Sequence, residues 1–554
     1  MEQIKKNNIL LLVIACIAIF FINLDAIWVN IMEARNFATA REMLQDNNWL
    51  LTTLNGEPRY QKPPLPTWLT AISAGIFGLK SLFAMRLPAA LITLVLVLTS
   101  YKLALKYTAH KTYSFISALI LATSFYIVFS GRNGQWDIFT HGFMMVCIYQ
   151  MYLFFTSEKR KYMHIIIAAL FFGCSFMSKG PVSLYALLLP FLIAYGFTYK
   201  YQNFKSRIIP IVLFLVIALV LSGWWHYYTY IKDPETVLAI TNKETGNWTS
   251  YNVRPFYYYW SFFTQSGIWT IPAFISLLYP YLKNRVFNKK AYLFTFLWTM
   301  ASVVLLSIIP EKKSRYLLPV LIPLALNCGF YIEYLFRRFS EIRNKRETVP
   351  VYFNFGLIGL IGVVFPIIGF VFLKDANLGA KWIWFALLSI TLFTLGLLIF
   401  KNLKLKKIRP VFFLTIAFIA SITCFGLPLA KSTQVNPDYK AMSELREWQV
   451  ENDNLPIYDL TFFTPEMIWD FGDTIPLFFD DEVNIIKNNK KFGILVAEHD
   501  EELFKETFVD GGNFRIEKIT RYDMNPQPVG NRQHKTRLWR DFFVVTVTSK
   551  EIQE

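Results

Sequence analysis

The sequence predicts a polytopic α-helical membrane protein with about 13 transmembrane helices, an amphipathic first outer loop and a C-terminal α/β soluble domain. Of the 554 residues, 54% are hydrophobic and 17% are aromatic, a combination that soluble chains of this length rarely have. Apolar runs of the roughly 18–20 residues that a bilayer crossing needs recur along most of the chain. Most lysines and arginines lie in short loops between these runs, as the positive-inside rule describes.

The apolar runs define the expected spans in order. They are residues 8–28, 87–107, 113–130, 138–155, a fifth ending at 178, 182–199, 208–225, an eighth ending before 283, 291–309, 316–336, 351–373, 382–400 and 411–430. The run 65–79 contains Gly75 and Gly78 and is short for a crossing. We interpret it as an interfacial helix beside an amphipathic helix over 33–45, because counting it as a span would invert every later basic loop.

Lys5 and Lys6 precede the first run and predict a cytoplasmic N-terminus. That run exceeds the h-region of a signal peptide, about 7–15 residues, and lacks a small-residue cleavage site, so we interpret it as a retained anchor. Residues 1–430 then form a transmembrane domain, and residues 431–554 form a soluble domain on the outer side. Five segments of this tail have strand composition, within 455–463, 474–479, 491–498, 514–522 and 540–549, and helical segments over 439–452 and 499–508 alternate with them.

The net charge of +17 does not indicate nucleic acid, because its placement in the loops matches membrane topology. The chain contains no phosphate-binding glycine loop of the Walker or GxGxxG type, no HExxH and no His/Cys metal cluster. Chemistry driven by a cytoplasmic nucleotide is therefore not indicated. The sequence identifies no cofactor, and it leaves open whether the site binds a divalent cation.

Three carboxylates near the outer side are candidates for chemistry. Glu33 begins the first outer loop, where it is either a first-turn helix residue or a general base. Asp137 lies at the start of the fourth span, where it is both a suitable N-cap and a functional candidate. Asp25 falls inside the first expected span, and we expect it to face the bundle interior, because a charge at mid-membrane costs about 2.5–3.5 kcal/mol on insertion scales.

Several cations map to the outer side, where topology disfavours positive charge. They are Lys62, Arg86, Lys179, Lys312, Lys313 and Arg315. Lysine and arginine hold phosphate through charge-assisted hydrogen bonds, so convergence of their loops predicts a phosphate site at the outer leaflet. The alternative is that these side chains reach lipid head groups. The loop 226–267 is rich in Tyr and Trp, which is typical of an interfacial belt and also of surfaces that stack on sugars.

These segments together resemble the GT-C type of membrane glycosyltransferases, closest to the bacterial lipid A aminoarabinose transferases, which are related to protein O-mannosyltransferases. The resemblance runs from about residue 25 to 319. The matching residues are Glu33, Arg35, Ala40-Arg41-Glu42-Met43, Asn55-Gly56-Glu57, Lys62-Pro63-Pro64, Arg86-Leu87-Pro88, Asp137, Lys179-Gly180-Pro181, Arg254-Pro255 with Tyr258-Tyr259, and Lys313 to Pro319. One departure is Met32, where the family usually has an aspartate before the loop glutamate.

The resemblance implies a donor sugar on a polyprenyl phosphate and an inverting displacement at the anomeric carbon. Glu33, or the displaced Asp25, would act on the acceptor nucleophile, and Asp137 would position it or hold a cation. The donor phosphate would be bound by Lys62, Arg86, Lys179 and Arg315, where developing charge is stabilised in the transition state. The other residues that we expect to bind substrate are Arg35, Arg59, Tyr259 and Tyr316.

The predicted localisation is the bacterial inner membrane, with a periplasmic tail. The expected partners are the donor lipid, a lipid A-like or other glycan or protein acceptor, and membrane lipid. A protein O-glycosyltransferase with the same donor is one alternative. Another is a flippase of lipid-linked sugars, although such transporters usually show inverted repeats and midplane charges. A receptor-like role for the tail is the weakest alternative, because the tail carries no recognisable site.

Overall fold

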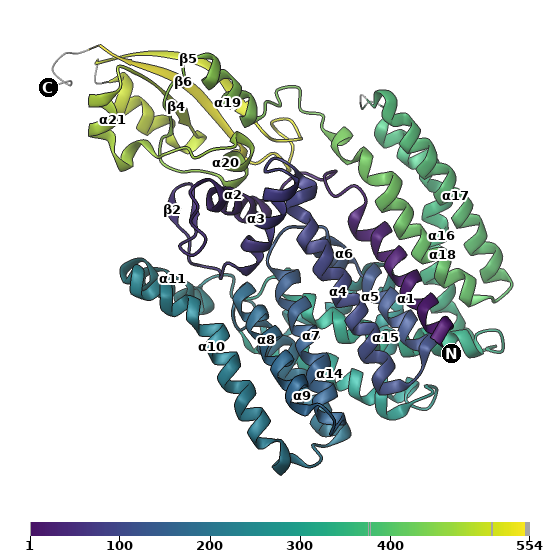
Figure 1. The fold of residues 1–554 in the computed structure, drawn as a ribbon. Helices are drawn as coiled ribbons and strands as arrows, with labels where there is room; N and C mark the ends of the chain where they lie inside the picture. The colour runs from purple at the N-terminus through teal and green to yellow at the C-terminus, as the bar shows by residue number, and fades with distance from the viewer. Residues whose placement is uncertain (1, 375, 377, 511–512, 549–554) are drawn as a thin grey trace.

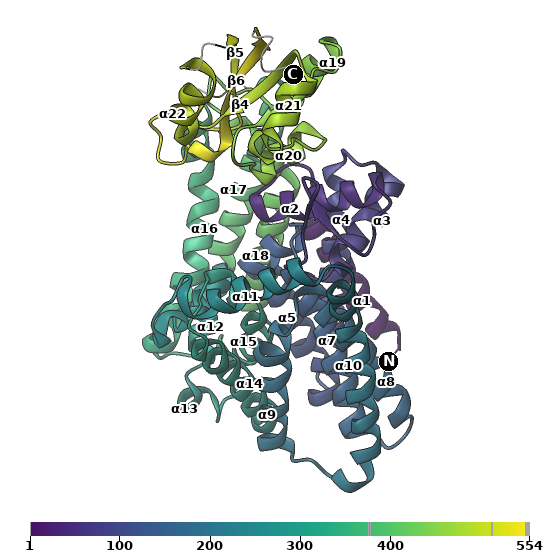
Figure 2. The ribbon, with the colours of Figure 1, turned by 90° about the vertical axis from the view of Figure 1, so that its left-hand side faces the viewer.

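The computed structural model describes residues 2–374, 376, 378–510 and 513–548, and most of them are helical. The helices form an elongated body, and a smaller domain that contains a sheet lies at one end of it (Figure 1, Figure 2). This tail domain, residues 434–548, rests beside α2 (Ile31–Gln45) and α3 (Leu65–Phe77). The predicted arrangement of a helical membrane domain followed by a small α/β tail is confirmed.

Nine helices of the described chain, counted with their flanking turns, are long and apolar enough to cross a membrane. They are α4 (Leu82–Thr108), α7 (Asp137–Thr156), α8 (Lys161–Lys179), α10 (Ile208–Lys232), α14 (Lys289–Ile308), α15 (Leu318–Arg338), α16 (Lys345–Leu373), α17 (Trp382–Lys404) and α18 (Ile408–Ser421). A tenth span is possible if α5 (Lys111–Thr123) and α6 (Phe125–Gly131), bent by 66°, count as one. The protein is thus a multi-pass membrane protein, whereas the expected number of 13 spans is not confirmed.

Three shorter apolar helices complete the bundle and its surface. They are α1 (Glu2–Cys16) continued by η1 (Ile17–Phe21), α9 (Leu189–Tyr199) preceded by η2 (Leu184–Leu188), and α3. At 1.5 Å per residue, the 13 residues of α3 extend over about 20 Å, less than the roughly 30 Å of a hydrocarbon core. The interpretation of this segment as a helix that does not span the membrane therefore agrees with its length.

The first helix ends earlier than expected, at Phe21, and Asp25 lies in the following turn with an exposed side chain. The expectation that Asp25 is buried within a span is therefore wrong. Two features of the structure explain why the first helix ends at Phe21. Asn23 has a left-handed backbone with φ 54°, and the Arg132 guanidinium donates hydrogen bonds to the carbonyls of Ile19, Ile22 and Asn23. Those carbonyls are the terminal acceptors that a continuing helix would use itself.

The expected eighth span is broken into short pieces. They are η4 (Phe256–Tyr259), η5 (Phe262–Trp269), α12 (Thr270–Ser276) and α13 (Tyr279–Leu282). Gly267 interrupts the helical geometry with φ 66°, a conformation that glycine adopts without steric cost. Before these pieces, α10 continues into α11 (Pro234–Ser250), a polar helix that runs crosswise at the upper end of α10 (Figure 2).

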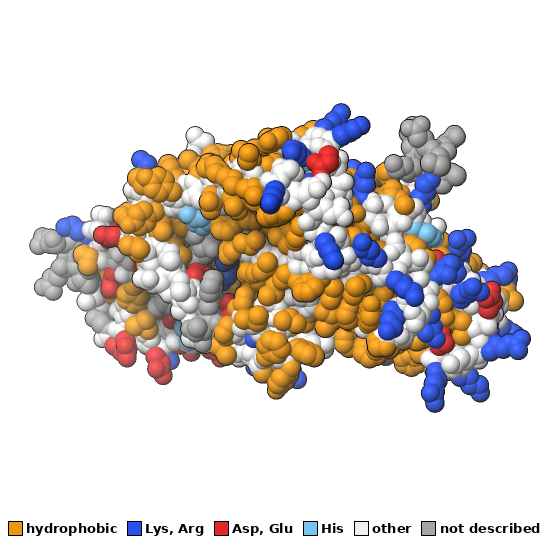
Figure 3. All heavy atoms as spheres, turned by 90° about the horizontal axis from the view of Figure 1, so that it is seen from below, with side chains coloured by type: hydrophobic (Ala, Val, Ile, Leu, Met, Phe, Trp, Pro, Cys, Tyr) orange, Lys and Arg blue, Asp and Glu red, His pale blue; other side chains and the backbone are white. Residues whose placement is uncertain are grey.

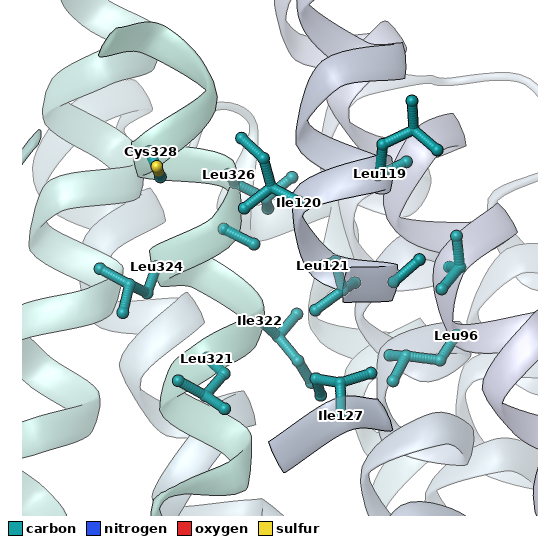
Figure 4. Close-up of a cluster of buried hydrophobic side chains, with 14 of the residues drawn as sticks. Leu96, Leu119, Ile120, Leu121, Ile127, Leu321, Ile322, Leu324, Leu326 and Cys328 are labelled. Atoms are coloured by element: carbon teal, nitrogen blue, oxygen red, sulfur yellow. The ribbon is translucent and has the colours of Figure 1, made fainter. Parts of the chain in front are cut away.

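The core lies between the helices, and α15 is at its centre with almost all of its span buried. Ile120 and Leu121 of α5 lie towards Ile322 of α15 in this core (Figure 4). The outer faces of α10, α16 and α17 are instead apolar and exposed, for example at Leu219, Phe372 and Ile390. Figure 3 shows hydrophobic side chains over much of one face, with Lys and Arg gathered mainly towards its right-hand side. Exposed apolar surface of this extent is typical of a membrane-facing surface.

The tail domain contains a four-stranded sheet in the order β3-β4-β6-β5. Its strands are β3 (Ile457–Asp459), β4 (Lys491–Val496), β5 (Phe514–Asp523) and β6 (Trp539–Val547). β3 and β4 are parallel and the other pairs are antiparallel. The segment 474–479 is not a strand, because only Leu477 forms an isolated bridge to Asp459. The helices of the domain are α19 (Met442–Glu451), α20 (Pro465–Phe471), α21 (Glu482–Asn488) and α22 (Glu501–Phe504).

Candidate active site

Glu33 lies in the first turn of α2 and forms a capping box with Asn30. The Asn30 side chain accepts hydrogen bonds from the backbone of Met32 and Glu33, and Glu33 accepts one from the Asn30 backbone. The Glu33 carboxylate also accepts two hydrogen bonds from Arg86 of α4, Nε to Oε1 at 2.7 Å and a terminal nitrogen to Oε2 at 3.0 Å. The side chains are only 1% and 2% exposed, so this is a buried bidentate ion pair.

The other partners of this pair are also within the protein. The Gly134 backbone N–H donates to Glu33 Oε1 at 3.0 Å, and Arg86 donates to the carbonyls of Leu24 and Ile27. Glu33 and Arg86 therefore join α2, α4, the turn after the first helix and the segment before α7. This geometry favours a structural role over the catalytic role expected for Glu33 and the phosphate-binding role expected for Arg86.

Asp137 is buried at the first turn of α7 and accepts a hydrogen bond from the ammonium group of Lys179 at the end of α8. Lys179 also lies over the ring of Tyr316, with its nitrogen 5.0 Å from the ring centroid. Tyr316 belongs to η6 (Ser314–Leu317), and its hydroxyl donates to Glu311 at 3.1 Å. Three of the predicted site residues, distant in the sequence, thus meet at one place.

Arg59 and Lys62 lie near the Asp137–Lys179 pair. Both belong to the first outer loop, just after the hairpin of β1 (Thr53–Leu54) and β2 (Glu57–Pro58). The Arg59 guanidinium lies 4.8 Å from the ring centroid of Trp136, the neighbour of Asp137, and donates to Thr39 Oγ1 at 3.3 Å. Burial lowers the pKa of Arg59 to about 9, and the nearby charge of Arg35 acts in the same direction. A lowered pKa of a cation means that its charged form lacks compensating partners.

Lys62 has one ionic partner among the described residues, Glu244 of α11, at 3.8 Å between Nζ and Oε2. Burial lowers the pKa of Lys62, Glu244 partly offsets this, and the charges of Lys179 and Arg59 lower it further. Lys62 is therefore within electrostatic range of both Lys179 and Arg59. An anion placed between them would be stabilised by all three.

Arg35 and Arg315 are the remaining cationic residues of the site. Burial lowers the pKa of Arg35, and Arg315 contributes in the same direction. The Arg315 Nε atom is buried and has no hydrogen-bond partner among the described residues. We call Arg35, Arg59, Lys62, Lys179 and Arg315 the cation cluster. Asp137 pairs with Lys179 and lies within electrostatic range of Lys62 and Arg315, so this region has a surplus of positive charge, which suits a phosphate group.

Tyr259 does not contribute its polar atom to the cation cluster. Its hydroxyl accepts a hydrogen bond from the Lys313 backbone N–H at 3.0 Å and donates one to the Lys313 carbonyl at 3.2 Å. Tyr259 thereby holds the segment that carries Arg315 and Tyr316. Arg35, Arg59 and Tyr316 remain expected substrate-binding residues, whereas the geometry of Tyr259 favours a supporting role.

Two features of the site were not predicted. Trp136 provides the ring under Arg59, and its indole N–H is buried without a hydrogen-bond partner among the described residues. Its position directly before Asp137 was the only available sequence signal. Glu466 and Arg537 of the tail domain lie within electrostatic range of Arg35, and no sequence pattern connected them with the first outer loop.

The cluster does not resemble a metal site. Among the described residues, no group of three or more His, Cys, Asp or Glu side chains is arranged to hold a metal ion. Asp137 is already paired with Lys179, and its other charged neighbours are mainly cations. These donors do not fit a divalent cation, which takes carboxylate, carbonyl or water oxygens.

Comparison with known proteins finds sequence similarity over part of the chain. Residues 61–226 match the model of the dolichyl-phosphate-mannose-protein mannosyltransferase family. The undecaprenyl phosphate-alpha-4-amino-4-deoxy-L-arabinose arabinosyl transferase 1 of Proteus mirabilis is 24% identical over 360 residues, which cover 62% of this chain and 63% of that protein. The chain thus spans less than two thirds of the length of this relative.

The similarity of fold covers almost the whole chain. The crystal structure of ArnT from Cupriavidus metallidurans in the apo state matches with a TM-score of 0.68, 15% identity and 99% coverage of both chains. The structure of ArnT from the same organism bound to undecaprenyl phosphate matches with a TM-score of 0.67, 16% identity and 98% coverage of both. These matches confirm the resemblance drawn from the sequence motifs. The chain therefore has the fold of these ArnT structures and is similar in sequence to the arabinosyl transferase of Proteus mirabilis and, over residues 61–226, to the mannosyltransferase family.

Proposed function

We propose that this protein transfers a glycosyl group from a polyprenyl-phosphate-linked sugar to a lipid A-like acceptor, at the outer face of the bacterial inner membrane, with a periplasmic tail domain. The observation that carries the proposal is the cation cluster, five neighbouring cationic side chains of which Lys179 pairs with the buried Asp137. The donor class is supported by the name of the Proteus relative and by the undecaprenyl phosphate bound to the Cupriavidus protein.

The donor phosphate would lie among Lys62, Lys179 and Arg315. Each is a cation near the end of a helix or in the outer loop, and the unpartnered Nε of Arg315 provides a donor for a phosphate oxygen. These side chains stabilise the leaving polyprenyl phosphate, whose negative charge increases as the bond to the sugar breaks. Fixed cations in a partly dry site stabilise such developing charge far better than water does.

The reaction is a single displacement at the anomeric carbon. An acceptor hydroxyl oxygen forms the new bond to this carbon, and the bond to the phosphate oxygen breaks with its electron pair on the leaving phosphate. The acceptor proton passes to a carboxylate, for which we propose Asp137. Inversion follows because the nucleophile approaches from the face opposite the leaving group. No metal ion takes part in the proposed step, since the residues of the cluster do not fit one.

Glu33 and Arg86 have a different part in this proposal. Because both Glu33 oxygens accept hydrogen bonds within the protein, we propose that the pair fixes the start of α2. Met32, which occupies the place of the usual family aspartate, offers no acidic group. The proposal therefore assigns proton transfer to Asp137 rather than to the first outer loop.

The experiment that tests the function uses purified protein in lipid nanodiscs, undecaprenyl phosphate carrying 4-amino-4-deoxy-L-arabinose, and lipid A. Mass spectrometry should show a mass increase of the lipid A by one sugar residue in the presence of the wild type. Asp137→Asn is the inactive control, and Glu158→Gln, an exposed acid in the loop after α7 that pairs with Arg207, is the matched active control. Absence of a lipid product with every donor tested would contradict the proposal.

A protein acceptor is the second candidate, because the matching family model is that of protein mannosyltransferases. Proteomic analysis of cells with and without the gene distinguishes the two. A sugar on periplasmic proteins and unmodified lipid A would favour the second candidate. Movement of the intact donor across vesicle membranes without sugar transfer would instead indicate a flippase.

A further inference from the structure

A second polar link lies one helical turn from the Asp137–Lys179 pair. The helices α7 and α8 pack side by side (Figure 1), and His141 follows Asp137 by four positions on α7. The Nδ1 atom of His141 lies 2.6 Å from the hydroxyl oxygen of Ser183, which is a hydrogen-bonding distance. Ser183 follows Lys179 by four positions, so the two links join the same two segments of the chain in the same order.

His141 is a neighbour of the charged pair as well as of Ser183. It is 1% exposed, Ser183 is 0% exposed, and both Asp137 and Lys179 are within electrostatic range of the imidazole. Residues four apart on a helix lie on the same face of that helix. The imidazole therefore lies on the face of α7 that carries the carboxylate proposed as the proton acceptor.

Lys179 extends from a segment in which the chain changes direction. It is the last residue of α8, and Gly180 follows it with φ 71°. The turn then leads through Ser183 into η2. A lysine side chain loses much rotamer freedom when it is held in one place, so the backbone that carries it must itself be fixed. The hydrogen bond from His141 to Ser183 ties this turn to the helix that carries Asp137.

We infer that His141 is a positioning residue for sugar transfer, which acts through Ser183 on the Asp137–Lys179 pair. This inference rests on the proposed function, in which Asp137 accepts a proton while Lys179 stabilises the leaving phosphate. The two tasks need both side chains at fixed distances from one reaction centre, and small misplacements reduce catalysis strongly. His141 itself contacts neither substrate in this role.

The same pair of helices provides a matched control. The Ser175 hydroxyl donates to the Thr140 carbonyl at 2.7 Å, and Thr140 Oγ1 donates to the Ser175 carbonyl at 2.8 Å. Ser175 is as buried as Ser183 and lies one turn before Lys179 on α8. Ser175→Ala therefore removes a buried hydroxyl between α7 and α8 and leaves the turn after Lys179 intact. Ser183→Ala removes the corresponding hydroxyl from that turn.

The test uses the full-length protein in lipid nanodiscs and compares Ser183→Ala, His141→Leu and Ser175→Ala. With lipid A and the aminoarabinose donor, Ser183→Ala and His141→Leu should lower kcat by about 10–100-fold, because the reacting groups are misplaced. Their affinity for undecaprenyl phosphate should fall by only about 3–10-fold, since the ammonium charge of Lys179 stays in the site. Ser175→Ala should keep the kcat and donor affinity of the wild type, while its melting temperature falls as much as that of Ser183→Ala.

Conservative replacements of His141 separate positioning from packing. The side-chain amide of Asn lies near the position of the imidazole Nδ1, whereas that of Gln lies near Nε2, so Asn is the replacement that keeps the bond to Ser183. His141→Asn should therefore restore most of kcat, and His141→Gln should not. In a Lys179→Ala background, the loss of donor affinity caused by His141→Leu should disappear, because no ammonium group remains to be positioned.

Three outcomes would overturn the inference. They are equal kcat values for Ser183→Ala and Ser175→Ala, a loss of transfer that follows the melting temperature in all variants, and equal kcat values for His141→Asn and His141→Gln. If His141→Leu does not fold, Ser183→Ala and the two amide variants still decide.

Failure of the proposed function has a different signature. A wild type that transfers no sugar would contradict the function, whereas donor binding still tests the role of His141. In that case, equal affinities for undecaprenyl phosphate in Ser183→Ala and Ser175→Ala would overturn the inference.

Discussion

Glu33 and Arg86 lie 53 positions apart in the chain and form a buried bidentate ion pair, in which both carboxylate oxygens face the guanidinium. The pair joins the start of α2 to α4, and the Gly134 N–H extends the junction to the segment that carries Asp137. Both residues belong to motifs that suggested chemistry. Their geometry instead explains how the first outer loop is held against the membrane helices.

Replacing Glu33 by Gln should therefore lower stability more than it affects the chemistry. The substitution leaves the Arg86 charge buried without its partner, and breaking a buried pair typically costs about 3–5 kcal/mol. We expect a clearly lower melting temperature in detergent and a loss of transfer that follows the folded fraction. Glu33→Gln combined with Arg86→Met should recover part of the stability, since no unpaired charge remains. A Glu33→Gln protein that melts like the wild type but transfers no sugar would restore the catalytic role expected from its sequence.

Asp137→Asn should separate chemistry from donor binding. A missing general base typically reduces the rate by about 10²–10⁴-fold. Because the same change removes the negative charge beside Lys179, the affinity for undecaprenyl phosphate should stay the same or increase. Single-turnover transfer and direct lipid binding measure the two effects, with Glu158→Gln as the control acid. A variant that loses donor affinity and activity together would mean that Asp137 only orients Lys179.

The membrane helices were predictable because long apolar runs have few alternatives in a bilayer. The expected span 87–107 lies within α4 (Leu82–Thr108). The early end of the first helix was not predictable, since the hydrophobic residues continue to Trp28. It depends on Arg132, a residue more than 100 positions away that binds the terminal carbonyls. The broken eighth span likewise depends on local backbone geometry at Gly267.

Which residues form the site was partly predictable from the sequence, whereas the ion pairs that they make were not. Lys62, Lys179 and Arg315 stood out because topology disfavours cations on their side. The same reasoning also selected Arg86, because charge and position alone cannot distinguish a cation with a buried partner from a free one. Glu466 and Arg537 carried no signal, because their proximity to Arg35 arises from the packing of α20 on α2.

Removing single cations of the cluster should weaken donor binding, and Arg315→Gln should do so without a loss of stability. Lys179→Ala also leaves the buried Asp137 carboxylate without its ion-pair partner, so its melting temperature should fall as well. Lys179→Ala and Arg315→Gln each remove charge-assisted hydrogen bonds, so we expect undecaprenyl phosphate to bind about 10–100-fold more weakly. Arg338→Gln is the matched control, because Arg338 lies at the opposite end of α15 in an exposed pair with Glu341. Lys179→Arg should restore only part of the affinity, since a planar fork replaces a point charge. Equal donor affinities in Arg315→Gln and the control would exclude Arg315 from the phosphate site.

The pH dependence of donor binding should depend on Lys62. Burial lowers the pKa of the Lys62 ammonium group in the free protein, and the charges of Lys179 and Arg59 add to this effect. Bound undecaprenyl phosphate, a phosphate monoester that is a dianion above about pH 6, raises that pKa again. Binding is therefore linked to uptake of a proton once the pH exceeds the lowered pKa. Donor affinity should be constant near neutral pH and fall as the pH rises through the free-state pKa of Lys62.

Two variants make this prediction specific to Lys62. Lys62→Arg should flatten the fall in donor affinity between neutral pH and the ordinary lysine pKa of about 10.4, because a guanidinium keeps its proton throughout that range. Glu244→Gln should increase the affinity near neutral pH, since the carboxylate that contacts Lys62 no longer competes with the phosphate. It should also move the fall to lower pH, because Glu244 raises the pKa of Lys62 in the free protein. The dissociation constant of undecaprenyl phosphate, measured across this range for the three proteins, checks both effects. Parallel curves for the wild type and Lys62→Arg would show that another group controls the pH dependence and that Lys62 does not contact the donor phosphate.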